Sequence, residues 1–239
     1  ARRNIGVQPI IDAVIAYLPS PRDAGEVTGK SPKSGADVAF KPEPSEPFSG
    51  LVFKVRANPS ADLYFLRTYS GVLKSNAKIY VPRTQQMVRL KRLLRIYAQH
   101  TEALDEVGPG DIIGFIGPKD IVTGDTLCEK HRSVAYEKMT FPEPVISMAL
   151  EPKSSNERDK LDDTLALICR EDPTLELSRD PNTGQRILSG MGELHLEINI
   201  HRLKDEFNLE AKCGQPRVAY RETIKQPVEI STTFQKTIG

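Results

Sequence analysis

Residues Leu188–Ile198 read LSGMGELHLEI, and the structure of this stretch and its continuation decides the fold of the C-terminal half of the chain. Apolar residues alternate with polar ones at positions 194, 196, 198 and 200, and that spacing alone favours a strand. A second pattern has the i, i+4, i+7, i+11 spacing of one helical face, at Leu196, Ile200, Leu203 and Phe207. Acidic residues come early in the segment and basic residues late, which suits the dipole of a helix. We therefore predict a helix over 193–207.

The segments around this helix predict the rest of a domain. A strand is expected at Val145–Leu150, followed by a helix whose start resembles a capping box at positions 154–157. Two short strands flank Asp180–Gly184, DPNTG, a sequence typical of a hairpin turn. A last strand is expected within Leu209–Tyr220. The order β-α-β-β-α-β over 143–222 is the split βαβ, or ferredoxin-like, arrangement.

The preceding residues, 47–136, have a different pattern, in which short β-forming runs alternate with turn sequences. The expected strands lie at 51–55, 63–68, 71–73, 77–81, 87–94, 111–116 and 126–127. Many short strands at near-regular spacing predict a small antiparallel barrel. The predicted fold class is therefore multi-domain β and α+β, with a small antiparallel β-barrel followed by a ferredoxin-like split βαβ domain.

Composition limits the classes of function. The chain has 239 residues, of which 38% are apolar and 27% charged, and this suits about two globular domains. The net charge of +1 argues against a general polycation, although local charge can differ from the sum. No apolar run approaches the roughly 18 to 20 residues of a membrane span, and the N-terminus lacks a secretory pattern, so we expect a cytoplasmic protein. The 3 cysteines are far apart and indicate neither a disulfide framework nor a zinc site.

The stretch Ala24–Ser31, AGEVTGKS, fits the loose form of a phosphate-binding loop. Such a loop needs a buried strand before it and a helix that begins at Lys30-Ser31, whose N–H groups face the phosphates. Two prolines precede the stretch, and Pro32 disfavours helical geometry at Ser31. We therefore interpret 22–46 as a solvated linker and argue against the rival function of a self-sufficient P-loop nucleotidase.

The stretch LSGMGELHLEI resembles the third domain of elongation factor G, the GTPase that moves tRNA and mRNA through the ribosome. Further similarities are spread along the chain. NIGVQPIIDAVIAYLPSP is similar to the family's exit helix from the GTPase domain, and YSGVLKSNAKIY, GPGDIIGFIG and TGDTLC are similar to its barrel, domain II. FPEPVISMALEP, REDPTLELSRDPNTGQ and VAYRETI are similar to the boundaries of domain III. The resemblance covers essentially the whole chain.

The resemblance implies a division of the chain into parts of that factor. These parts are the exit helix of a missing GTPase domain (1–21), a linker (22–46), the barrel of domain II (47–136), a linker (137–142), domain III (143–222) and the start of domain IV (223–239). The residues at 228–234 by themselves predict a strand. The resemblance also implies a fragment without catalytic residues, cofactor or metal of its own. GTP and Mg would be held by the GTPase domain.

The resemblance implies partners as well. These are the ribosome, through small-subunit rRNA and ribosomal proteins, and the protein's own GTPase domain; no membrane is involved, and the protein is expected to be a monomer. Related ribosome-dependent GTPases stay open as alternatives, namely a ribosome-recycling paralogue or a tetracycline-resistance ribosomal-protection protein. An organellar matrix is the alternative location.

Residues 78–100 contain six basic residues and no acid. A solvated barrel face would explain this composition, and so would a stripe that tracks RNA phosphates without reading sequence. The family's domain II lies on the small ribosomal subunit, and this favours the second interpretation. The candidate rRNA contacts are Arg89, Lys91, Arg92 and Arg95. Because successive strand residues point to opposite faces, we expect about half of them to face the RNA.

The predicted helix at 193–207 is apolar on two sides, and we expect the side that contains Leu196 to pack on its own sheet. The resemblance implies that the other side faces the GTPase domain, near the cleft that binds the antibiotic fusidic acid. The candidate residues for this interface and pocket wall are Leu194, His195, Ile198 and Arg202.

Other polar residues have simpler explanations. His195 and His201 are six positions apart, which is not the i, i+4 spacing of paired metal ligands. Glu171, Asp172 and Asp180 lie beside prolines in predicted turns, so capping and solvation explain them better than acid–base chemistry.

Overall fold

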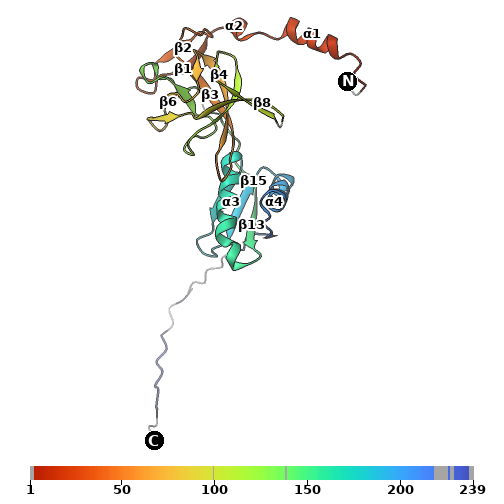
Figure 1. Cartoon of the computed structure of the whole chain (residues 1–239). Helices are drawn as coiled ribbons and strands as arrows, with labels where there is room; N and C mark the ends of the chain where they lie inside the picture. The colour runs from red at the N-terminus through yellow and green to blue at the C-terminus, as the bar shows by residue number, and fades with distance from the viewer. Residues whose placement is uncertain (1–2, 99, 138, 218–225, 227–228, 237–239) are drawn as a thin grey trace.

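A computed structural model describes residues 3–98, 100–137, 139–217, 226 and 229–236. Within these parts the chain forms a barrel and, below it in Figure 1, a smaller domain of sheet and helices. Helix α1 (Val7–Tyr17) extends away from the barrel in Figure 1, and none of its residues is buried. Residues 229–236 form neither helix nor strand, in contrast to the strand expected there, and the expected boundary at VAYRETI lies outside the described residues. No described helix has the length and apolar character needed to cross a membrane.

The barrel is made of short strands joined mostly by tight turns. Its strands are β3 (Ser49–Arg56), β4 (Leu63–Ser70), β5 (Leu73–Lys74), β6 (Lys78–Val81), β7 (Gln86–Arg89), β8 (Arg92–Tyr97), β9 (His100–Leu104), β10 (Glu106–Val107), β11 (Ile112–Ile116) and β12 (Thr126–Cys128). The main antiparallel sheet has the order β7-β6-β12-β3-β4-β11-β8-β9, and β5 pairs with β10 beside it. Val52, Leu66 and Phe115 are among the apolar side chains that fill the interior. The antiparallel barrel predicted from the sequence is therefore confirmed.

Between β7 and β8 the chain passes from one end of this sheet to the β11–β8 end. The N–H of Leu90 donates to the carbonyl of Ala77 beside β6, and the N–H of Lys91 donates to the carbonyl of Ile116 in β11. The single strand expected at 87–94 is therefore divided in two, because the chain changes its pairing partner at this point.

The segment 22–46, which we interpreted as a solvated linker, is folded onto the barrel. After a short helix α2 (Pro21–Ala24), strands β1 (Val27–Lys30) and β2 (Asp37–Phe40) form an antiparallel hairpin. Phe40 is 1% exposed and packs with Val134 and Tyr136. A few well-placed apolar side chains therefore outweigh a composition rich in proline, glycine and charge.

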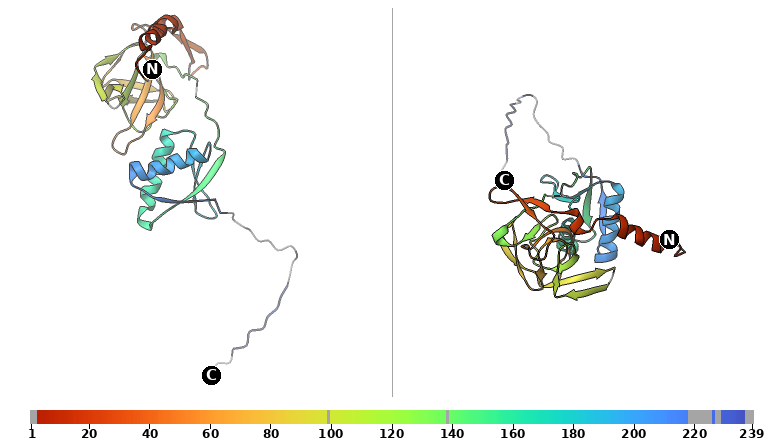
Figure 2. Two further views of the ribbon diagram at one scale, coloured as in Figure 1. Left: turned by 90° about the vertical axis from the view of Figure 1, so that its right-hand side faces the viewer. Right: turned by 90° about the horizontal axis from the view of Figure 1, so that it is seen from above.

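The second domain is an antiparallel sheet covered by two helices (Figure 2). Its elements are β13 (Ile146–Pro152), α3 (Arg158–Glu171), β14 (Glu176–Arg179), β15 (Arg186–Gly190), α4 (Glu193–Phe207) and β16 (Ala211–Gly214), in the sheet order β14-β15-β13-β16. Leu150, Leu165, Leu188 and Leu196 meet in its core. This is the predicted β-α-β-β-α-β order, and α4 has the predicted bounds.

The start of α3 differs from the expected capping box. A short 3₁₀ turn, η2 (Ser155–Glu157), precedes the helix, and the N-cap residue Glu157 makes no side-chain capping hydrogen bond. The N–H of Glu157 instead donates to the backbone carbonyl of Ser154. Because of this extra turn, the N-cap of α3 is Glu157. Ser154 and Glu157 are therefore not at the N-cap and N3 positions that a capping box requires.

Candidate functional site

The barrel presents cations on its outer surface without acidic partners. Lys78 in β6 lies directly opposite Arg89 in β7 in the antiparallel ladder, and both side chains are exposed. Among the described residues, no ion pair or side-chain hydrogen bond involves Lys78, Arg89, Lys91 or Arg92. Like charges that face each other across strands destabilise a sheet. An anion bound over the Lys78–Arg89 pair would relieve this repulsion.

The four candidate rRNA contacts are all exposed, but they do not form one face. Arg92 and Arg95 are three positions apart on β8, so they point to opposite sides of that strand. Arg95 also approaches Glu102 of β9, with 4.0 Å between the guanidinium and the carboxylate. Arg89 beside Lys78 is therefore the best candidate for a phosphate contact, and the roles of the other three stay predictions.

The sixth basic residue of the 78–100 run, Arg83, has a structural role. Arg83 makes two hydrogen bonds to Asp125, at 2.6 and 2.9 Å, and Asp125 is 3% exposed. The hydrogen bond to Asp125 raises the pKa of Arg83. The sequence gives no sign of this pairing, because the two residues are far apart along the chain.

The side chains of α4 divide as the helical spacing predicted. Leu196 and Leu203 are 0% and 1% exposed in the domain core, whereas Leu194 and Ile198 are 69% and 50% exposed. Ile200 and Phe207 are partly buried against the core. The alternation at 194–200 is thus explained by a helix with one packed apolar side and one open apolar side.

His195 and Arg202 lie at the border between these two sides and have partners within the domain. His195 Nε2 lies 2.8 Å from a carboxylate oxygen of Asp172, and Arg202 donates to Glu171 at 2.7 Å. Burial alone would raise the pKa of Asp172, but hydrogen bonds from Thr174 and His195 outweigh it and hold that pKa below its usual value. Glu171 and Asp172 therefore anchor α4 to the end of α3, which is more than the capping and solvation we expected of them.

Asp180 behaves as its turn sequence predicted. Its carboxylate accepts the N–H groups of Asn182 and Thr183, at 2.7 and 2.9 Å. These hydrogen bonds lower the pKa of Asp180. The residue closes the hairpin between β14 and β15.

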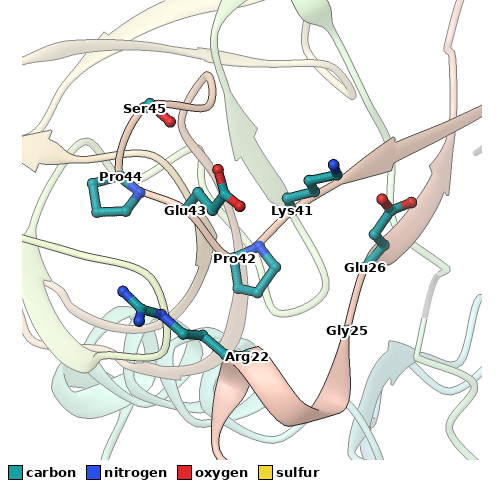
Figure 3. A pocket seen from close by; sticks show the side chains of 8 residues that line it. All are labelled: Arg22, Gly25, Glu26, Lys41, Pro42, Glu43, Pro44 and Ser45. Atoms are coloured by element: carbon teal, nitrogen blue, oxygen red, sulfur yellow. The ribbon is translucent and has the colours of Figure 1, made fainter.

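The AGEVTGKS stretch spans β1 and the residues on either side of it, beside a hollow of about 680 Å³ (Figure 3). The N–H of Lys30 donates to the carbonyl of Ala135 and that of Ser31 to the carbonyl of Ala36, at 2.9 and 2.8 Å. Lys30 continues a strand of a hairpin, and no helix begins at Ser31. The backbone donors that a phosphate-binding loop offers to its ligand are thus used, by Ser31 within the hairpin and by Lys30 in a bridge to Ala135.

Comparison with known proteins agrees with this architecture. Residues 47–130 match the family described as elongation factor G domain 2, and residues 141–215 match elongation factor G, domain III. A crystal structure of a protein from Thermus thermophilus is similar, with a TM-score of 0.73 and 29% sequence identity. The similarity covers 94% of this chain and 31% of that protein.

A small antiparallel barrel followed by a ferredoxin-like domain places the chain among the translation elongation factors. Within that class, the chain belongs to the elongation factor G family and carries its domains II and III.

Proposed function

We propose that this chain is the ribosome-binding and coupling part of an elongation factor G that promotes GTP-dependent movement of tRNA and mRNA. The barrel would bind small-subunit rRNA and ribosomal proteins, and domain III would transmit the nucleotide state. The proposal rests on Lys78 and Arg89, which face each other on a barrel of this family and have no acidic partner among the described residues. A polyanion such as rRNA is the partner that such a pair favours.

The open side of α4 supports the coupling part of the proposal. Leu194 and Ile198 expose a large part of their apolar surface, and His195 and Arg202 border them. We propose that the GTPase domain of the intact factor covers this side. In this arrangement GTP and Mg are held by that domain, and the present chain supplies no catalytic group.

Ribosome binding tests the role of the barrel. We expect the variant Arg89→Gln with Lys91→Gln to bind small ribosomal subunits more weakly, and the slope of log affinity against log salt to flatten by about one to two, because up to two phosphate contacts are lost. The control is Lys33→Gln with Lys41→Gln, which changes the charge equally next to the β1–β2 hairpin. An unchanged slope in the first variant would contradict the proposed contact.

Nucleotide titration tests the AGEVTGKS stretch. We expect no saturable binding of a fluorescent GTP analogue to this chain at about millimolar concentration, because the N–H groups of Lys30 and Ser31 already donate to the backbone carbonyls of Ala135 and Ala36. Saturable binding that disappears in Lys30→Ala would support the P-loop nucleotidase instead.

A further inference from the structure

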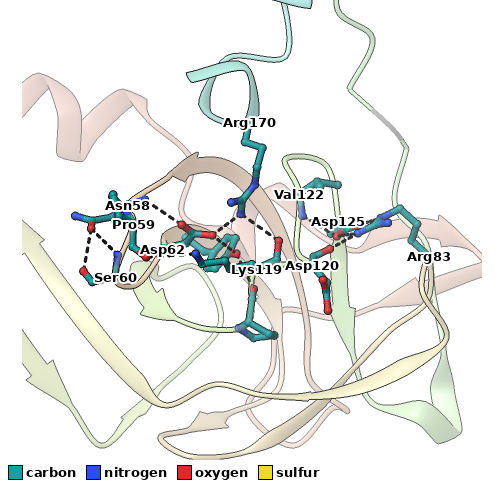
Figure 4. Close-up of polar contacts among 12 residues, drawn as sticks. Asn58, Pro59, Ser60, Asp62, Arg83, Lys119, Asp120, Val122, Asp125 and Arg170 are labelled. Carbon is teal, nitrogen blue, oxygen red and sulfur yellow. Dashed lines mark hydrogen bonds and ion pairs between the residues drawn. The ribbon is translucent and has the colours of Figure 1, made fainter. Parts of the chain in front are cut away.

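Asp62 is a carboxylate with no exposure to solvent, at the end of the barrel that meets domain III (Figure 4). It lies in the loop between β3 and β4 and accepts the N–H of Asn58 at 2.9 Å. The hydroxyl of Tyr64 lies 3.1 Å from its other oxygen and 2.6 Å from the carbonyl of Pro118. Because one hydroxyl proton cannot serve both acceptors fully, the barrel alone leaves this carboxylate incompletely neutralised.

The cation that faces Asp62 comes from the other domain. Arg170, in the last turn of α3, donates to the carboxylate of Asp62 and, at 3.1 Å, to the carbonyl of Lys119. These two acceptors belong to two separate barrel loops, so one guanidinium joins α3 to both. Figure 4 shows Arg170 reaching from the helix into this group of barrel residues.

Little else in the junction resembles a shared core. A cleft of about 930 Å³ lies between β3 and the ends of α3 and α4, and charged side chains such as Lys54, Arg56 and Glu206 line it. None of the three buried apolar clusters of the described residues combines side chains from both domains. The orientation of the two domains therefore depends heavily on polar contacts.

We propose that Arg170 and Asp62 form a latch that holds domain III in one orientation against the barrel. Moving domain III away would take the cation from a carboxylate that is fully buried while the domains are in contact, and a charge-assisted hydrogen bond to such a group contributes more than an exposed ion pair. The latch thus favours one domain orientation, and a partner that reorients domain III must supply the free energy to open it. This inference does not depend on the proposed ribosomal function.

The distance between two spin labels tests the latch. One label is placed on the exposed Cys213 of β16 and one on Thr101→Cys of β9. Cys128 is buried, and burial raises the pKa of Cys169 to about 11, so both react poorly at neutral pH. In the labelled chain without a further substitution, we expect one narrow distribution of the distance between the labels.

In Arg170→Gln we expect the latched population to fall about tenfold or more relative to other orientations, with a broad distribution of distances. Asp62→Asn should broaden it too, and the double variant should add little to either single change, because both remove the same interaction. Arg158→Gln, at the opposite end of α3, is the matched control and should keep the narrow distribution.

A narrow distribution in Arg170→Gln, or equal broadening in Arg158→Gln, would overturn the latch. Circular dichroism shows whether each variant is folded. If Arg170→Gln fails to fold, Asp62→Asn decides, because it removes the charge on the barrel side while keeping the shape of the side chain, and an unchanged narrow distribution there would also overturn the proposal.

Discussion

On the barrel, Lys78 and Arg89 face solvent opposite each other, whereas in domain III Arg186 and Arg202 are held by carboxylates of the same domain. Arg186 has a side chain only 8% exposed and binds Asp162. Domain III thus uses these charges to join its own elements, and it leaves apolar rather than basic surface open on α4. This difference supports the different partners proposed above, a polyanion for the barrel and a protein surface for domain III.

The largest expected effect tests the two sides of α4. Leu196→Asp should lower the free energy of unfolding by about 3–5 kcal/mol, because it places an unpaired charge in the domain core. Leu194→Asp is the matched control in the same helix and should change it by less than about 0.5 kcal/mol, since its side chain is in solvent near the helix N-terminus. Thermal melts of the two variants compare them. Equal loss of stability would show that α4 has no open side.

Acid should weaken the contact between the two domains. Burial alone would raise the pKa of Asp62, but hydrogen bonds from Asn58 and Arg170 outweigh it and lower that pKa. A lowered pKa gives stability that is present above pH about 4 and lost as pH falls through the folded value. Between pH 7 and about 3, Asp62→Asn should therefore lose less stability than the unchanged chain in urea unfolding. The same loss in both would mean that Asp62 contributes nothing to the pH dependence.

The exposed pair Arg95–Glu102 should contribute least. Its partners are 48% and 61% exposed and 4.0 Å apart, so we expect Glu102→Gln to change the free energy of unfolding by less than about 0.5 kcal/mol. Thermal melts at low and moderate salt check this. A larger loss would show that the β8–β9 hairpin depends on the pair, and that Arg95 is engaged within the barrel much as the arginines of domain III are within theirs.

The sequence predicted the helices and strands whose positions depend on local periodicity. The bounds of α4, the order of elements in domain III and the strands β3, β4 and β11 follow from spacing and turn residues over short distances. The β1–β2 hairpin was missed because its stability comes from Phe40 packing against residues some ninety positions later. Arg83–Asp125 and Arg170–Asp62 were invisible for the same reason, since both pairs join distant parts of the chain.

The candidate site was predicted in part. Exposure of Arg89, Lys91, Arg92 and Arg95 agrees with a surface role, but the sequence could not show that Lys78 faces Arg89, because that depends on strand register. The open side of α4 could be predicted from helical spacing alone. The contacts of His195 and Arg202 with the end of α3 could not be predicted from the sequence.

The most direct test of the barrel's proposed role is Arg89→Glu, measured for stability and for binding to small ribosomal subunits. Opposite charges would then face each other in the β6–β7 ladder, so the free energy of unfolding should rise by about 0.2–1 kcal/mol. Binding should weaken and its salt dependence should flatten, while Lys33→Glu, which changes the charge equally in the β1–β2 turn, should leave binding close to that of the unchanged chain. A more stable barrel that binds less well is the predicted result. Arg89→Glu with unchanged affinity and salt slope would contradict the account.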